Sequence, residues 1–214
     1  MFIGKIRKFI FDTLFPKKCF GCTREGYYIC PSCIEKIPRS DRVSMDILSV
    51  FKYKHPVVRR LLWNLKYNGR SGIAHEFGDY MSDTLISELE DSALYENMRE
   101  IYLVPMPMSK ERKKKRRENH AKTLAEAISK QTNFPIMDCL HKTRDTKRQA
   151  LIKNRTKRLL NVKNSMELKT EFDIKGKNIV LVDDIVTTGG TIQEARRVLL
   201  SHGARKIIAL VVAH

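Results

Sequence analysis

Long hydrophobic runs are missing from this 214-residue sequence, and their absence excludes a membrane-spanning helix. No apolar stretch approaches the ~20 residues that such a helix needs. Internal repeats and low-complexity segments are also absent, so the length fits one α/β domain with a small appendage. No small-residue cleavage site follows the basic and apolar residues 2–15, so we expect no secretory signal and a cytoplasmic protein.

Residues 2–15 have apolar side chains near helical spacing, interrupted by Lys5, Arg7 and Lys8. We expect an amphipathic helix that packs on the rest of the protein, because apolar helix faces usually meet a core. The alternative is a peripheral membrane contact, in which a basic amphipathic helix lies on the lipid surface.

Acidic residues are few relative to basic ones, 24 against 41, which gives a formal net charge of +17. Residues 110–117 carry a net charge of +6 and residues 142–163 carry +8, so these two segments supply +14. Such clustering favours a polyanionic partner or an acidic ligand drawn into a cleft, although charge runs are often only solvated loops. The candidate nucleic-acid contacts are Lys110, Arg112, Lys113, Lys114, Lys115, Arg116, Arg117, Arg144, Lys147, Arg148, Arg155 and Arg158.

Aromatic residues are absent from residues 103–133 and 135–171, which include both basic segments. Base stacking on a single strand would therefore have to come from elsewhere, for instance Tyr27, Tyr28, Trp63 or Tyr67. For residues 142–163 a helix, a mobile hood over a site and a partly disordered arm all stay open.

Four of the five cysteines form two Cys-x-x-Cys pairs, Cys19 with Cys22 and Cys30 with Cys33. Four thiolates at this spacing are typical of a closed structural zinc site. Disulfides or a redox pair are the rival interpretations, but a reducing compartment disfavours the first and a redox motif needs only one pair. Cys139 is isolated, and we expect it to be a small buried apolar residue.

Residues 179–192 hold the most informative local pattern. The apolar residues 179–182 predict a buried strand, and Thr191 opens an amphipathic helix that Gly203 ends. The carboxylates Asp183 and Asp184 lie between them, placed to accept hydrogen bonds from sugar hydroxyls or to help hold Mg²⁺. The turn that follows, which would present backbone N–H groups to a phosphate, consists of Thr187, Thr188, Gly189, Gly190 and Thr191. A phosphate, a diol and a metal together indicate a ribose 5-phosphate ligand.

Further elements follow from hydrophobic periodicity. Helices are expected over residues 57–65, over 73–85 and from Asn119, and strands over 101–104 and 207–212. The strand–helix–strand unit across residues 179–212 should be parallel.

Residues 180–191 resemble the phosphoribosyl pyrophosphate (PRPP) signature of type I phosphoribosyltransferases at twelve consecutive positions. The resemblance implies that the acidic pair contacts the ribose hydroxyls and that the threonine-glycine turn holds the 5-phosphate. No Gly-Lys-Ser/Thr follows the turn, so it is not a Walker loop.

The order of motifs along the chain is similar to that in the ComF family. The motifs are the four cysteines, Phe51 and Tyr53, residues 65–69, residues 104–107 and the PRPP turn. Asn119 to Ala121, Gln149 and the pair Arg158 and Asn161 extend the resemblance. Residues 116–120 depart from it, because Arg-Arg-Glu-Asn-His stands where the family has Arg-Gly-Phe-Asn-Gln.

The family resemblance implies a type I phosphoribosyltransferase-like α/β fold, a mostly parallel sheet flanked by helices. It also implies a zinc ribbon or knuckle within residues 1–40, ahead of a phosphoribosyltransferase-like domain at 41–214. The expected role is in natural competence, handling single-stranded DNA during uptake, with competence-machinery proteins as partners.

The alternative is a phosphoribosyltransferase of nucleobase salvage. PRPP would bind with Mg²⁺, Asp183 and Asp184 would be the catalytic pair, and Lys66 and residues 105–117 would stabilise the departing pyrophosphate.

Overall fold

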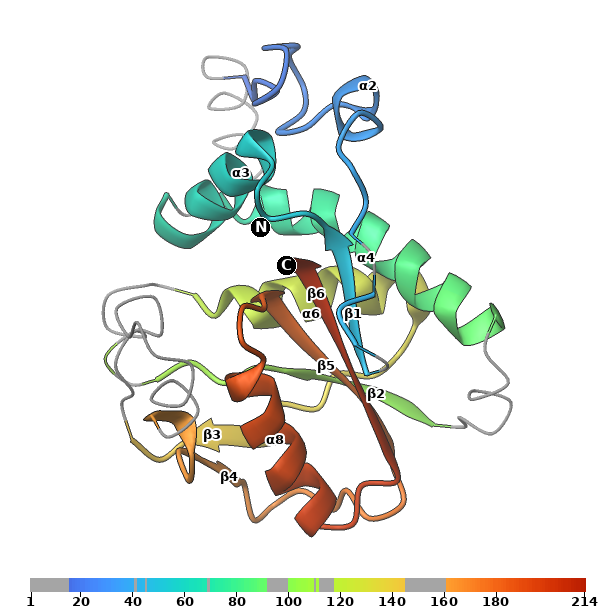
Figure 1. The fold of residues 1–214 in the computed structure, drawn as a ribbon, viewed down its shortest axis with the longest axis vertical. Coiled ribbons are helices and arrows are strands. Elements are labelled where there is room, and N and C mark those ends of the chain that lie inside the picture. The colour runs from blue at the N-terminus through green and yellow to red at the C-terminus, as the bar shows by residue number, and fades with distance from the viewer. Residues whose placement is uncertain are drawn as a thin grey trace, which may run out of the picture.

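Within the described residues, four parallel strands form the larger sheet, as the computed structural model shows (Figure 1). The structure describes residues 16–40, 42–44, 46–68, 70–91, 100–109, 111, 118–144 and 161–214. In this part of the chain the strands are β1 (Ile47–Phe51), β2 (Ile101–Pro105), β3 (Leu140–Lys142), β4 (Met166–Leu168), β5 (Asn178–Ile185) and β6 (Lys206–Ala213). The helices are α2 (Pro31–Ile34), α3 (Pro56–Tyr67), α4 (Gly72–Asp91), α6 (His120–Thr132) and α8 (Gly190–Ser201). None of these helices combines the length and apolar character of a membrane span.

The sheet has the strand order β1-β6-β5-β2, and every neighbouring pair is parallel. The predicted mostly parallel sheet and the parallel unit β5–α8–β6 are therefore confirmed. Because parallel strands share one direction, the carboxyl ends of β1, β2, β5 and β6 lie along one edge. Segments that follow these strands, far apart in sequence, converge at this carboxyl edge, which is where open α/β sheets bind ligands.

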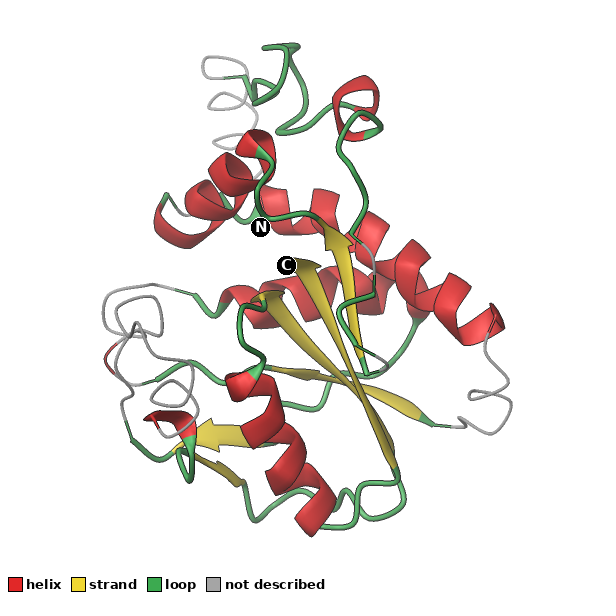
Figure 2. Cartoon of the chain, in the orientation of Figure 1, coloured by secondary structure: helices red, strands yellow, loops and turns green. Residues whose placement is uncertain are grey.

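Helices cover both faces of the sheet (Figure 2). Along β5 the alternate side chains Val180 and Val182 pack in one core with α3, α4 and α6, while Ile179 and Leu181 pack in a second core with α8. Full burial of one such aliphatic side chain contributes about 1.5–3 kcal/mol to folding. The continuous apolar run of the strand thus reflects burial on both faces.

The cysteine-containing segment packs into the first of these cores. Cys19, Ile29 and Ile34 are buried in the same cluster as Phe51 of β1 and Phe77 of α4. The Glu76 carboxylate of α4 accepts hydrogen bonds from the backbone N–H groups of Tyr28 (2.9 Å) and Ile29 (2.7 Å). Apolar burial and charge-assisted hydrogen bonds together hold this segment against α4.

Strands β3 and β4 form an antiparallel pair that the sequence analysis did not predict. The second basic segment begins at Lys142, the last residue of β3, and ends shortly before β4. Next to the strand pair, Thr143 N–H donates to the carbonyl of Ser165 (3.1 Å). Residues 145–160 lie outside the described residues, so the helix, hood and arm alternatives stay open there. The amphipathic segment 2–15 lies outside them as well.

Candidate functional site

The acidic pair lies near the end of β5, at the carboxyl edge of the sheet. The strand runs to Ile185 rather than ending at Val182, because Asp183 and Ile185 keep their register with Val211 and Ala213 of β6. The predicted strand was therefore too short. Hydrogen bonds within the sheet fix the backbone of Asp183 and Asp184. This part of the chain therefore needs no backbone ordering when a ligand binds.

The threonine-glycine turn connects β5 to α8 as predicted. Gly189 has a φ of +74° and is the N-cap of α8, a conformation in which a residue with a Cβ would be strained. The helix begins at Gly190, one residue before the predicted start at Thr191. The backbone N–H groups of a first helical turn point out of the helix end, and the helix dipole is positive at this end. The turn therefore suits a phosphate group.

Lys66 lies beside the acidic pair although it comes from α3. Its Nζ is 2.9 Å from Asp184 Oδ2, and the two side chains are only 18% and 15% exposed. The backbone carbonyl of Lys66 also lies 3.2 Å from His120 Nε2 of α6. The structure thus brings together Lys66, Asp183 and Asp184, three of the site residues predicted from the sequence.

Asp183 has a pKa raised from its ordinary value of 3.8 to about 7. Burial is the main cause and the negative charge of Asp184 is the second. The Asp184 N–H, which donates to Asp183 Oδ1 at 2.8 Å, and the charges of Lys66 and Lys142 lower the pKa but do not restore it. Two adjacent carboxylates whose charge is incompletely balanced are a hard-oxygen donor set that Mg²⁺ fits.

Lys142 is a neighbour of this site that sequence reasoning missed. It ends β3, is 9% exposed, and acts electrostatically on Asp183. In the sequence it stands out only as the first charge of the segment 142–163. No sequence pattern predicts that Lys142 lies near Asp183, because this depends on where the antiparallel pair of β3 and β4 packs.

The four cysteines form a compact cluster, as the spacing predicted. The Sγ atoms of Cys19, Cys22, Cys30 and Cys33 lie within 4.8 Å of one another, and no disulfide joins them. Tetrahedral zinc with Zn–S bonds of about 2.3 Å would separate its thiolates by somewhat less than 4 Å. The 3.6 Å between the sulfurs of Cys22 and Cys30 matches that spacing.

The surroundings of these thiols also suit a bound cation. Burial pushes the Cys19 pKa upward, but hydrogen bonds from Cys30 and Gly21 N–H groups, both 3.3 Å, help to lower it to about 6. Contacts with Cys22 and burial raise the Cys33 pKa to about 12, so the cluster resists full ionisation on its own. A Cβ on Gly21 would lie 2.8 Å from Cys33 Sγ, so the loop closes around the sulfurs only with glycine there. The cluster could therefore bind a metal such as zinc, which would compensate four thiolates.

Most of the predicted nucleic-acid contacts lie outside the described residues. These are Lys110, Arg112, Lys113, Lys114, Lys115, Arg116, Arg117, Lys147, Arg148, Arg155 and Arg158. Arg144 is described, and its Nη2 donates to the carbonyls of Asn161 (3.1 Å) and Lys163 (2.8 Å). This side chain ties the two ends of the second basic segment together, so its guanidinium is partly committed to the backbone.

The connection from β2 to α6 leaves the sheet next to the acidic pair. Met106 N–H donates to the carbonyl of Val182 (2.9 Å), and the Asn119 side chain donates to the carbonyl of Met106 (3.1 Å). Both ends of the connection from β2 to α6 are therefore anchored at the carboxyl edge.

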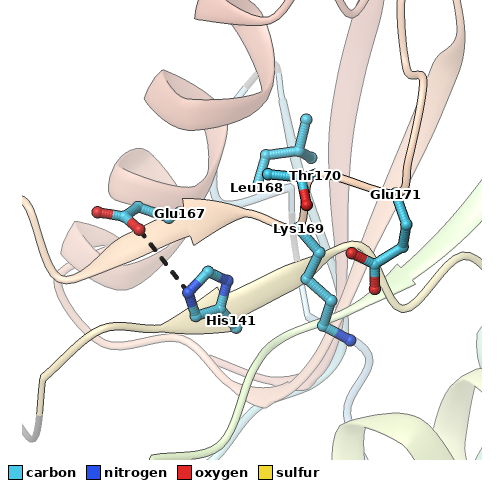
Figure 3. Close-up of a pocket in the computed structure, with 6 residues that line it drawn as sticks. All are labelled: His141, Glu167, Leu168, Lys169, Thr170 and Glu171. Carbon is cyan, nitrogen blue, oxygen red and sulfur yellow. Dashed lines mark ion pairs between the residues drawn. The ribbon is translucent and has the colours of Figure 1, made fainter.

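A hollow lies along β3 and β4 (Figure 3). It is open to solvent, and its dashed ion pair, His141 Nε2 to Glu167 Oε2 at 3.7 Å, joins two exposed side chains. Exposed pairs contribute about 0–1 kcal/mol, so the hollow shows little sign of a built site.

Comparison with known proteins agrees with the geometry. Residues 118–214 match the phosphoribosyl transferase domain model. The chain is 30% identical to competence protein ComFC of Bacillus subtilis (strain 168), over 87% of this chain and 79% of that protein. It is 27% identical to DNA utilization protein YhgH of Escherichia coli O157:H7, over 83% of this chain and 74% of that protein.

Among solved structures, hypoxanthine phosphoribosyltransferase from Trypanosoma cruzi is 13% identical, with a TM-score of 0.42 over 66% of this chain and 63% of that one. That score supports no functional argument. The family instead follows from the ComFC match over most of both chains, joined with the four-cysteine cluster and the phosphoribosyltransferase-type domain. The chain belongs to the ComF family.

Proposed function

We propose that this protein handles single-stranded DNA in natural competence and that its phosphoribosyltransferase-type site binds PRPP or ribose 5-phosphate with Mg²⁺. The proposal rests on one observation. Lys66, Asp183 and Asp184 lie close together just before helix α8, which begins at Gly190. The names of two relatives, a competence protein and a DNA utilization protein, support the cellular role.

Each part of the ligand has a matching group in the site. The 5-phosphate would bind the turn of residues 187–191 through backbone N–H groups. The ribose hydroxyls would donate to Asp183 and Asp184, and Mg²⁺, when bound, would neutralise the diphosphate and these carboxylates. Lys66 Nζ would turn from Asp184 toward the diphosphate once the metal replaces it.

Calorimetric titration with PRPP, with and without Mg²⁺, tests the pocket. Wild-type protein should bind only weakly without the metal, and the double substitution Asp183→Asn with Asp184→Asn should abolish the metal-dependent part. Glu167→Gln, which removes an exposed carboxylate that does not belong to the proposed site, is the matched control and should leave binding unchanged. A wild-type protein that binds neither PRPP nor ribose 5-phosphate contradicts the proposal.

The DNA-handling half of the proposal depends on the basic segments. Changing Lys113, Lys114, Lys115 and Arg116 to Ala should weaken single-strand binding and flatten its salt dependence. The log–log slope should change by roughly 0.7 for each phosphate that these side chains no longer neutralise. The Asp183/Asp184 double variant should bind DNA at least as well as wild type, because it removes negative charge. Normal binding by the basic-segment variant would mean that the segment is only solvated charge.

Salvage enzyme activity is the second candidate, and the retained acidic pair with its lysine favours it. In that reaction a base nitrogen would form a bond to ribose C1 while the C1–oxygen bond breaks and pyrophosphate leaves. The protein would contribute positioning and charge stabilisation. Release of pyrophosphate from PRPP, measured with each common base, would establish turnover, and its absence with every base would restrict the site to binding.

A further inference from the structure

Helix α3 exposes two large aromatic rings on the face opposite its core. Trp63 and Tyr67 are four residues apart, so they lie one above the other along the helix. Their ring centroids are 5.6 Å apart with an interplanar angle of 43°, and they are 54% and 50% exposed. The opposite face, with Val58 and Leu65 among its residues, is fully buried. We call the two rings the α3 aromatic step.

The segment of the chain that carries this step has charged residues of one sign. Residues 47–75 contain no aspartate or glutamate. Their basic residues are Lys52, Lys54, Arg59, Arg60, Lys66 and Arg70. An apolar surface for a protein partner is usually poor in charge at its centre and mixed at its rim. Exposed rings within an exclusively basic segment instead complement a polyanion that carries flat aromatic groups.

Arginines already stack on aromatic rings near the step. Arg59 lies 6.0 Å from the ring centroid of Tyr53, and both side chains belong to exposed residues. Arg60 lies 5.4 Å from the ring of Phe20, in the cysteine-containing segment, and its Nη1 donates to the Phe20 carbonyl (3.4 Å). Stacking holds a guanidinium plane while its outer N–H groups can still contact phosphate oxygens.

This arrangement extends beyond α3. Arg70 lies 5.5 Å from the ring of Phe20 and 5.9 Å from that of Tyr28. Aromatic and basic side chains therefore alternate from α3 to the cysteine-containing segment, which lie at the same end of the molecule (Figure 1). Alternation of this kind fits a strand whose bases stack on rings while its phosphates contact cations.

We propose that the α3 aromatic step binds single-stranded DNA by stacking bases on Trp63 and Tyr67, with Arg59 and Arg60 contacting the backbone. The inference rests on the proposed DNA-handling function and assigns it a surface. The basic segments at 110–117 and 142–163 have no aromatic residues, so they can attract a strand but cannot stack its bases. In a duplex the base faces are already stacked on one another, so the step selects single strands.

The position of α3 connects this surface to the acidic site. Lys66 and Tyr67 are consecutive residues, and Lys66 reaches Asp184 at the carboxyl edge. Helix α3 therefore carries both the step and Lys66 of the acidic site, and the two share no side chain. A substitution in the step should leave PRPP binding unchanged.

Intrinsic fluorescence gives a direct test, because Trp63 is the single tryptophan of the chain. Titration of the full-length, zinc-loaded protein with an oligothymidylate of about 20 nucleotides, long enough to cover a typical single-strand site, should quench this fluorescence. A duplex of equal length should quench it much less. Trp63→Ala and Tyr67→Ala should each weaken binding, measured by fluorescence anisotropy of a labelled oligonucleotide, by roughly 5- to 100-fold. The salt slope should stay unchanged, because the phosphate contacts remain.

Two further variants make the result specific. Trp63→Phe keeps a stacking ring and should restore most of the affinity. Leu200→Ala removes an equally exposed apolar side chain (48%) from α8 and should have no effect. If Trp63→Ala and Tyr67→Ala bind the oligonucleotide like wild type, the step is not the binding surface, although DNA handling stands. If wild-type protein binds no single strand, the inference and the DNA-handling function both fail.

Discussion

Asp183→Asn should stabilise the metal-free protein while it disables the site. The substitution keeps the shape of the side chain and an oxygen that can accept the Asp184 N–H, now found at 2.8 Å. It removes a carboxylate whose pKa burial and Asp184 raise to about 7. Each unit of pKa shift corresponds to about 1.4 kcal/mol. Because Asp183 keeps partial contact with solvent, we expect a gain of about 1–3 kcal/mol in the free energy of unfolding above pH 7.

The sign of the pH dependence follows from the same shift. Between about pH 4 and pH 7 the folded protein binds a proton at Asp183 that the unfolded chain has released, so wild-type stability falls as pH rises. Below about pH 4 both states are protonated, and the variant should have no advantage from this residue. The difference between variant and wild type should therefore grow from near zero at pH 4 to its maximum above pH 7.

Urea unfolding followed by circular dichroism, in EDTA across this pH range, measures that difference. Asp184→Asn is the control with the opposite sign, because it removes the partner of a mostly buried lysine 2.9 Å away and should destabilise the protein. An Asp183→Asn protein less stable than wild type at pH 8, or a difference that does not vary with pH, would refute the reasoning.

Three further predictions concern the cysteine cluster and the turn. Cys30→Ser should abolish zinc binding and lower the melting temperature, since Cys30 is fully buried; a metal content unchanged by mass spectrometry would contradict this. Gly189→Ala should lower the free energy of unfolding by about 1 kcal/mol in urea titration, because φ is +74° there; equal stability would count against strain. Glu76→Gln should weaken the hydrogen bonds to Tyr28 and Ile29, cost about 1–2 kcal/mol and speed hydrogen exchange of those two amides; unchanged exchange would disprove the docking role.

The parts of the fold that follow from contiguous sequence were predictable. The strand, turn and helix of residues 179–201 lie together in the chain, and apolar periodicity with a glycine turn is a local signal. The same holds for the helix from Asn119, whose side chain does cap α6 by accepting from Ala121 N–H. The two Cys-x-x-Cys pairs were also sufficient to predict the cluster.

Strands and contacts that depend on residues far apart in the sequence were not predictable. Strands β3 and β4 have three residues each, too few for a hydrophobic period to show, and their partners are more than twenty residues apart in the sequence. Strand β1 contains Ser49, a buried polar residue that interrupts the apolar pattern and donates to the carbonyl of Phe51 (3.3 Å). The contacts of Lys66 and Lys142 with the acidic site join different elements, and a single sequence holds no signal for them.

A metal bound by the four cysteines would stabilise more than its own loop, because Cys19, Cys30 and Ile34 share a core with Phe51 and Phe77. A ligand that binds only the folded state adds to stability by mass action, so free zinc would set the fraction of protein that stays folded. Removal of the metal by a chelator would release more than a peripheral loop, since the departing segment uncovers apolar surface on β1 and α4. Such exposed surface invites proteolysis and aggregation, so cells short of zinc should hold less of this protein at equal synthesis.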